Sequence, residues 1–170
     1  MSEIAEDIAQ QYLTFCLGNE TFAVDVAKTR EVIDGINITD VPQTPDYMLG
    51  VINLRGGVVP VIDMRRKFSM EAKEHTVETC IIVLEVNVEG EAVIVGALAD
   101  SVSEVLEIKA GQIEPPPRLG SKLNTEFIQG MGNIDDNFVI LLDIDKVFSV
   151  EELELVREMN DERDEVEAEV

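Results

Sequence analysis

The chain has 170 residues, enough for one compact domain or two small, closely packed ones and too few for a large multidomain protein. Its 35 acidic against 13 basic side chains give a formal net charge of -22, which disfavours nucleic acid and anionic lipid as partners. Such acidity also fits simple solubility or a salt-adapted host, so it names no ligand. Val and Ile dominate a hydrophobic fraction of 45%, only 5% of residues are aromatic, and this mix predicts mainly β structure.

The two cysteines and the N-terminus bear on the cellular compartment. Cys16 and Cys80 each lie in an apolar run, where a free cysteine behaves as a small hydrophobe, so a reducing cytosol fits best. Residues 1–10 are acidic where a secretory leader would be basic and then apolar, and we expect them to form a flexible arm. No apolar run reaches the roughly 18 residues that cross a bilayer, so we expect a cytoplasmic protein without direct membrane insertion.

The periodicity of apolar residues predicts a succession of short strands. Residues 12–17 alternate as a half-buried strand does, and Arg55-Gly56-Gly57 has the glycines that a tight hairpin turn with positive φ needs. Pro60 cannot donate a ladder hydrogen bond, so its strand is expected to lie at a sheet edge or to carry a bulge. The expected strands, in chain order, are 12–17, 22–26, 50–54, 58–63, 79–86, 92–99, 128–133 and 138–143.

Few segments favour helix. Residues 27–34 are expected to form one short helical stretch, and 100–106 resembles it. Ser149 and Glu152 have the spacing of a capping box, which predicts a C-terminal helix. Residues 160–170 are strongly acidic and are predicted to form a disordered tail.

The chain contains an internal repeat. At a shift of 80, Gly50, Asn53, Ile62-Asp63 and Phe68 fall on Gly130, Asn133, Leu142-Asp143 and Phe148, and at a shift of 73 residues 23–33 fall on 96–106. Each copy, roughly 11–78 and 79–148 with an exchange of strands left open, supplies about five short strands and one short helix. Because that is too little for a secure core, the copies are expected to pack face to face as two small closed barrels. A single eight- or ten-stranded sandwich would also explain the number of strands, but the repeat favours two barrels.

Residues suited to catalysis or metal binding are scarce. His75 lies in the polar connector 67–78 with no ligand at metal-binding spacing, and neither cysteine has a CxxC partner or a base nearby in sequence. No glycine-rich phosphate loop follows a strand into a helix, and acid pairs such as Asp135-Asp136 suit a solvated turn. We therefore expect no enzyme, no catalytic residue, no cofactor and no metal, while a hydrolase that uses two distant acids stays open as an alternative.

A purely structural role explains two features less well than it explains the residues above. Arg55 stands at a hairpin tip in a chain poor in basic residues, where it is either a solvated turn residue or a recognition arginine. Residues 101–108 contain Val102, Val105, Leu106 and Ile108, which are either core residues or, in part, an apolar docking patch.

Five segments in a fixed order carry a resemblance to a known family. They are Gly50-Val51-Ile52-Asn53-Leu54-Arg55-Gly56, Val59-Pro60-Val61-Ile62-Asp63-Met64-Arg65, Val95-Gly96, Asp100-Ser101-Val102-Ser103-Glu104-Val105-Leu106 and Phe127-Ile128-Gln129-Gly130-Met131-Gly132. Together they resemble the CheW-like coupling domains of chemotaxis, and the similarity spans roughly 11–158.

The resemblance implies a single CheW-like domain over 11–158, built of two five-stranded SH3-like β-barrels packed face to face, with short helices and a C-terminal helix. It implies a scaffold without catalysis that couples methyl-accepting chemoreceptors to the histidine kinase CheA and supports control of its activity. The implied partners are the regulatory domain of CheA and the cytoplasmic tips of the receptors, in membrane-associated receptor arrays. A CheW-like adaptor of a non-flagellar kinase pathway, such as pili or surface sensing, is the alternative.

The resemblance also implies which residues bind partners: Glu31, Thr39, Gly50, Arg55, Val102 and Val105. Glu31 and Arg55 match polar positions associated in the family with receptor or kinase coupling, and Gly50 matches a backbone position sensitive to substitution. Val102 and Val105 match second-barrel positions near a receptor-facing groove between the barrels.

Overall fold

The computed structural model describes residues 9–34, 38–40, 47–68, 70–71, 74, 76–88, 90–115 and 127–148, and this part of the chain is mainly β, as expected. The expected C-terminal helix, the acidic tail and His75 lie outside the described residues. The N-terminal arm expected over 1–10 is wrong for Ala9 and Gln10, because both already pair with Lys109 and Ile108 in the first strand.

Short elements follow one another along the whole described chain. The strands are β1 Ala9–Leu17, β2 Glu20–Asp25, β3 Thr29–Ile33, β4 Met48–Leu54, β5 Gly57–Asp63, β6 Cys80–Val88, β7 Glu91–Ala99, β8 Ser101–Lys109, β9 Ile113–Glu114, β10 Ile128–Ile134 and β11 Asn137–Leu142. The helices are α2 Met64–Lys67 and α3 Ile144–Val147, and the 3-10 turns are η1 Val26–Lys28 and η2 Ala110–Gln112.

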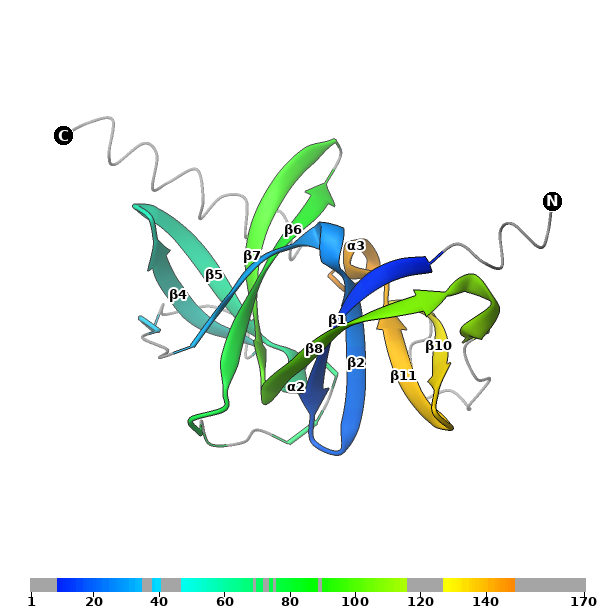
Figure 1. The fold of residues 1–170 in the computed structure, drawn as a ribbon. Helices are drawn as coiled ribbons and strands as arrows, with labels where there is room; N and C mark the ends of the chain where they lie inside the picture. Colours follow the sequence, from blue (N-terminus) through cyan, green and yellow to red (C-terminus); the bar gives the residue numbers. More distant parts are fainter. Residues whose placement is uncertain are drawn as a thin grey trace.

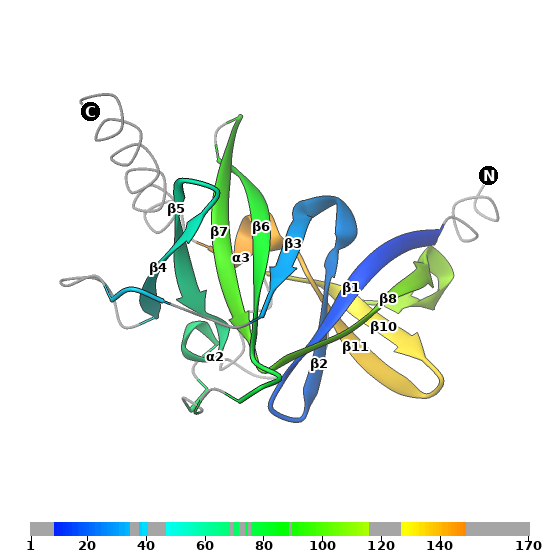
Figure 2. The same cartoon turned by 60° about the vertical axis from the view of Figure 1, so that its left-hand side comes forward.

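The strands form two sheets, which Figure 1 and Figure 2 show side by side. One sheet has the order β8-β1-β2-β11-β10-β9 and the other β3-β6-β7-β5-β4. Each contains one parallel pair, β2 with β11 and β5 with β7, and its other pairs are antiparallel. The sheets are the two SH3-like barrels expected from the sequence, although the two-residue strand β9 gives one of them six strands.

The chain passes from one sheet to the other twice, through η1 between β2 and β3 and through Asp100 between β7 and β8. The helical stretches expected over 27–34 and 100–106 are wrong, because β3 and β8 occupy most of both. In such short runs the spacing of apolar residues does not distinguish a helix from a strand. The β-branched residues of both runs fit an edge strand that is paired on one side.

The repeat at a shift of 80 reappears in the structure. β4, β5 and α2 follow one another as β10, β11 and α3 do, and both hairpins have a bulge at the matching place, between Met48 and Gly50 and between Ile128 and Gly130. Both hairpin turns have two residues with positive φ, Arg55-Gly56 and Asp135-Asp136, as the tight hairpin turns that match strand twist require.

Pro60 shows how the strand order differs from the sequence expectation. Its strand β5 lies between β7 and β4, so an edge position is wrong, and the bulge of this hairpin is on the neighbouring strand β4. The ladder to β7 begins only at Val61, one residue later, so the missing N–H of Pro60 interrupts no pair of that ladder.

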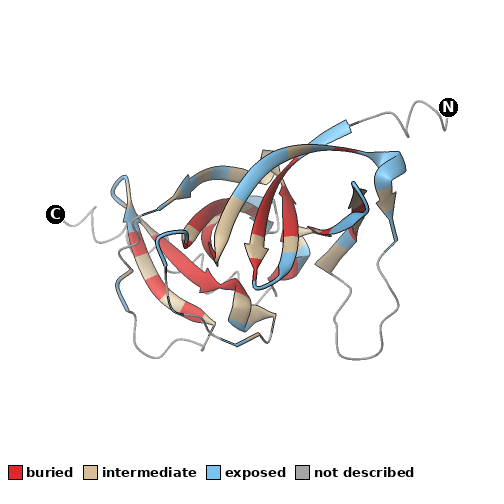
Figure 3. Ribbon diagram, turned by 60° about the horizontal axis from the view of Figure 1, so that its bottom comes forward, coloured by how far each residue is buried: buried red, intermediate tan, exposed pale blue. Residues whose placement is uncertain are grey.

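Apolar side chains form one core between the sheets and one inside each barrel. Along β6, Ile82 and Leu84 point into the shared core, while Ile81 and Val83 point into the interior of their own barrel. A third cluster, around Leu141, fills the other barrel. Figure 3 shows the buried stretches along the central parts of the strands and exposed residues at the hairpin ends.

Because the barrels pack together, strands that would be half-buried in a lone barrel are covered on both faces. The half-buried pattern expected for 12–17 is therefore wrong, since Tyr12 and Phe15 lie on opposite faces and both are 1% exposed. Thr14 is also buried, and its hydroxyl donates to the carbonyl oxygen of Glu104 at 2.7 Å and accepts the Glu104 N–H at 3.1 Å, beside the β1–β8 bulge.

The shared core predicts a large cost for a cavity in it. Leu84→Ala is expected to lower the free energy of unfolding by about 3 kcal/mol, because its side chain is fully buried between the barrels. Urea unfolding with both barrels monitored checks this. The exposed Val77→Ala is the control, with an expected change within about 0.5 kcal/mol, and a Leu84→Ala cost as small as the control's would contradict a shared core at this position.

Candidate functional site

An ion pair links the two edges of the five-stranded sheet, the strand β3 and the turn that follows β4. Glu31 lies on β3, one edge of the sheet, and Arg55 lies in the turn between β4, the other edge, and β5. The Arg55 guanidinium is 2.8 Å from the Glu31 carboxylate, and their side chains are 80% and 26% exposed. Sequence reasoning named both residues without pairing them, and the structure places them together at the barrel closure.

Thr39 and Gly50 complete the same closure. Thr39 pairs with Val51 of β4 through two backbone hydrogen bonds of 2.8 Å. A Cβ added to Gly50 would lie 2.1 Å from the carbonyl oxygen of Thr39 and 2.9 Å from Ile38, and the φ of Gly50 is +154°. Only glycine fits this close approach, which gives a physical reason for sensitivity to substitution at Gly50.

The second barrel closes in the same way but with the opposite charge at its turn. Ile113 and Glu114 lie against Gly130, where an added Cβ would come within 2.6 Å of the Ile113 side chain and 3.0 Å of the Glu114 carbonyl oxygen. The turn corresponding to Arg55-Gly56 is Asp135-Asp136. The two barrels therefore share a backbone design and present different electrostatic surfaces.

Val102 and Val105 lie on β8, the edge strand of the six-stranded sheet, and only one of them is openly exposed. Val102 packs against the shared core and its backbone faces the Cys80 thiol of the other barrel, whereas 50% of Val105 is exposed. Val32, on the edge strand β3, is 41% exposed. Sequence reasoning missed it, although the shift of 73 places Val32 on Val105, so the repeat carried that signal.

The site residues form two groups on edge strands of different barrels. Glu31, Thr39, Gly50 and Arg55 gather at the closure of the five-stranded barrel, and Val102 and Val105 follow β8 on the other sheet. Edge strands and exposed apolar side chains are the usual places where a second polypeptide docks. The arrangement suits binding of protein partners on two faces.

The described residues bear on metal binding, thiol reactivity and membrane crossing. They contain no group of three or more His, Cys, Asp or Glu side chains placed to hold a metal ion. Burial raises the pKa of the Cys80 thiol, which leaves less thiolate at neutral pH. None of the helices in this part of the chain is long and apolar enough to cross a membrane.

Two barrels that exchange strands along the chain and pack on a common core, with edge strands that carry exposed side chains, define a β-barrel adaptor. The CheW-like domain model matches residues 11–152, and the chain belongs to this family. Chemotaxis protein CheW of Klebsiella aerogenes is 40% identical over 151 residues, covering 89% of each chain. Protein FrzA of Myxococcus xanthus is 30% identical over 128 residues, covering 75% of this chain and 77% of FrzA.

A solved structure agrees with the family match. The crystal structure of scaffolding protein TtCheW from Thermoanaerobacter tengcongensis superimposes with a TM-score of 0.74 at 31% sequence identity. The superposition covers 84% of this chain and 94% of that one. The fold expected from the sequence resemblance is confirmed.

The close approach at Gly50 predicts a selective loss of stability. Gly50→Ala is expected to cost about 3 kcal/mol or more, because the methyl group would overlap the Thr39 carbonyl and force the barrel closure apart. Chemical denaturation measures this cost. Gly90→Ala is the control, since Gly90 also has positive φ but open space around it, and about 1 kcal/mol is expected there. Equal costs at the two glycines would show that backbone strain alone, and not the Thr39 contact, sets the effect.

Proposed function

We propose that this protein is a chemotaxis scaffold that couples methyl-accepting chemoreceptors to the histidine kinase CheA and supports control of the kinase. The observation that carries the proposal is the match to CheW chemotaxis proteins along nearly the whole folded chain, with the same two-barrel structure in a scaffolding protein. In this role the protein contributes binding surfaces and no catalytic group. It acts at membrane-associated receptor arrays.

The relatives bear on the choice between chemotaxis and another kinase pathway. Besides the Klebsiella protein, relatives from Rhizobium meliloti and Helicobacter pylori are chemotaxis proteins CheW, at 35% and 34% identity. Protein FrzA, which has a different name, is 30% identical and covers 75% of this chain, against 85% and 81% for these two relatives. An adaptor of a non-flagellar pathway is therefore not favoured.

We assign a different kind of contact to each of the two groups of edge residues. We assign the barrel closure at Glu31 and Arg55 to polar contacts with the receptor tip or the regulatory domain of CheA. Its charged groups are accessible and already positioned by each other. Val102 borders the junction of the barrels and Val105 is exposed further along the same strand, so a receptor coiled coil would meet apolar side chains along β8.

A reconstitution tests the proposal directly. Vesicles that contain a chemoreceptor and purified CheA from the same organism are assayed for kinase autophosphorylation with and without this protein. A several-fold rise that requires receptor, kinase and this protein together is expected. A pull-down from native lysate with mass spectrometry identifies the partners. Absence of both the rise and a CheA-type kinase from the pull-down would overturn the proposal.

Arg55→Ala is expected to weaken coupling without unfolding the protein. The side chain is 80% exposed and its ion pair is a surface one, so stability should change by less than about 1 kcal/mol. If the arginine contacts a partner, its loss should raise the dissociation constant for that partner by about tenfold. Calorimetry measures the dissociation constant for the partner, and thermal unfolding measures the change in stability.

Arg30→Ala is the matched control for Arg55→Ala. Arg30 is also an exposed arginine paired with a glutamate, but that partner, Glu85, lies on the neighbouring strand β6, so the pair is not part of the contact between β3 and the β4–β5 turn. It should leave partner binding nearly unchanged. Equal losses of binding in both variants would point to net charge, and a large drop in melting temperature for Arg55→Ala would make that residue structural.

A further inference from the structure

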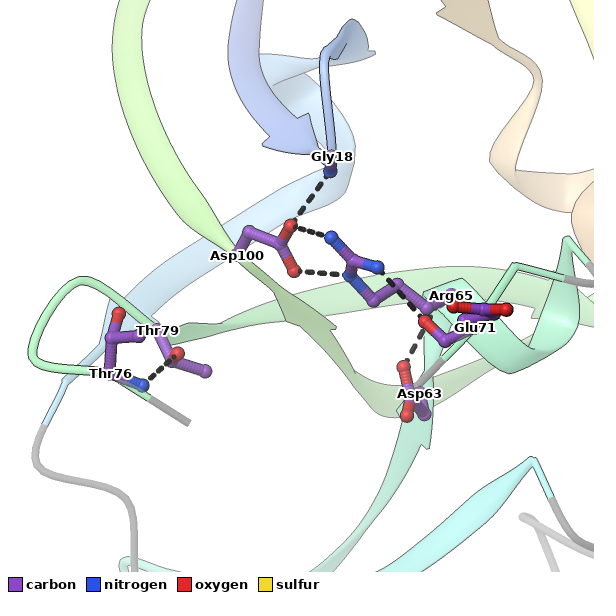
Figure 4. A network of polar contacts seen from close by, with 7 residues as sticks. All are labelled: Gly18, Asp63, Arg65, Glu71, Thr76, Thr79 and Asp100. Carbon is purple, nitrogen blue, oxygen red and sulfur yellow. Dashed lines mark hydrogen bonds and ion pairs between the residues drawn. The ribbon is translucent and has the colours of Figure 1, made fainter. Parts of the chain in front are cut away.

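The two crossings of the chain between the barrels are each held by an ion pair with a short helix. At the β7–β8 crossing, Arg65 of α2 donates from Nε to Asp100 Oδ1 at 2.7 Å and from Nη2 to Oδ2 at 2.5 Å. The same carboxylate accepts the Gly18 N–H of the other barrel at 2.7 Å (Figure 4). This cluster, which we name the first seam, thus ties α2 of the five-stranded barrel to the β1–β2 turn of the six-stranded barrel.

The β2–β3 crossing has the same arrangement with reversed charges. Lys28 of η1 lies 3.1 Å from the carboxylate of Asp145 in α3, and that carboxylate accepts the Asn87 N–H of β6 at 3.1 Å. The shift of 80 places Asp145 on Arg65, so the acid now stands on the helix and the base on the crossing. This second seam ties α3 of the six-stranded barrel to a strand of the five-stranded barrel.

The seams differ in strength. The first is a bidentate arginine–carboxylate pair whose side chains are only 14% and 13% exposed, and a further guanidinium nitrogen donates to the Glu71 carbonyl oxygen at 2.9 Å. The hydrogen bond to Asp100 raises the pKa of Arg65, so the guanidinium stays protonated. At the second, a single ammonium meets a carboxylate at 34% and 36% exposure, where solvent and salt weaken the attraction.

A surface hollow borders the second seam. An open hollow of about 160 Å³ lies there, lined by Asp25, Lys28, Gln129, Leu142, Asp143 and Ile144. Apart from Lys28 at the crossing, its lining residues belong to the six-stranded barrel, so the hollow leaves the Lys28 side of the seam open to solvent. The hollow agrees with the higher exposure of the Lys28–Asp145 pair, and this exposure marks the second seam as the weaker one.

We propose that the two barrels change their relative orientation by opening at the Lys28–Asp145 seam while the Arg65–Asp100 seam remains closed and acts as the pivot. The shared core permits a small rotation because only one end of the interface is released. The proposal concerns the fold itself and does not depend on the partners named above.

Each seam carries its own reporter, because a backbone N–H donates to its carboxylate: Gly18 at the first and Asn87 at the second. Amide hydrogen exchange of ¹⁵N-labelled protein is followed by NMR at about 0.01 M and about 1 M salt, where the Debye length falls from about 30 to about 3 Å. Protection of Asn87, normalised to exposed turn amides, is expected to fall roughly fivefold with salt. Protection of Gly18 is expected to stay within about twofold.

Variants separate opening at the seam from general destabilisation. Lys28→Gln should lower the protection of Asn87 even at low salt, remove most of its salt dependence and leave Gly18 protected. Arg30→Gln, which breaks the Arg30–Glu85 pair inside one sheet, is the matched control and should leave both reporters unchanged. Equal loss of protection at Gly18 and Asn87 in Lys28→Gln, or salt-insensitive protection at both, would overturn the proposal.

A distance measurement excludes fraying of β6 as the cause. Nitroxide labels at the exposed positions Ala92 and Asn137, one on each barrel, are placed in a chain with Cys16→Ser and Cys80→Ser. Electron–electron double resonance should show a broader distance distribution for Lys28→Gln than for Arg30→Gln. Identical narrow distributions would show that the barrels do not move and would overturn the pivot, whatever the exchange rates.

Discussion

The apolar layer between the two sheets is the constraint on which the rest of the molecule depends. Neither barrel has enough residues for a secure core, so each buries the outer face of its central strands against the other. Four of the six phenylalanines form a continuous stack through this layer, Phe15 on Phe22, Phe22 on Phe68 and Phe68 on Phe127, with ring centroids 5.1 to 5.7 Å apart. The stack joins β1 and β2 of one barrel to the end of α2 in the other.

The exchange of β3 and β8 between the sheets positions the candidate binding surfaces. Because the chain crosses between sheets twice, the edge of each barrel is built by a strand that directly follows a strand of the other barrel. The Glu31–Arg55 closure and the exposed Val32 and Val105 lie on these exchanged strands and the hairpin facing one of them. A movement of one barrel relative to the other would therefore move the candidate partner-binding residues with it.

The seams show how a duplicated fold acquires asymmetry. The backbone of the two halves repeats down to the position of the bulge, the positive-φ turn and the glycine under the closing strand. The side chains do not repeat: Arg65 corresponds to Asp145, and Arg55 to Asp135. Backbone geometry is fixed by packing, which both halves share, whereas the charges at the turns and seams are free to differ and can give each barrel its own partner.

The sequence by itself determined the β class, the hairpins at 50–63, 79–99 and 128–143, the repeat and the family, because turn residues and alternating apolar residues are local signals. Only the tertiary structure decided that 27–34 and 100–106 are mostly strand, since an edge strand is stabilised by a neighbour far away in sequence. The pairing of Glu31 with Arg55, and the separation of both from Val105, likewise depend on how the strands exchange. Residue types indicated which side chains could bind a partner. The order of strands in each sheet decided which of these side chains lie close together.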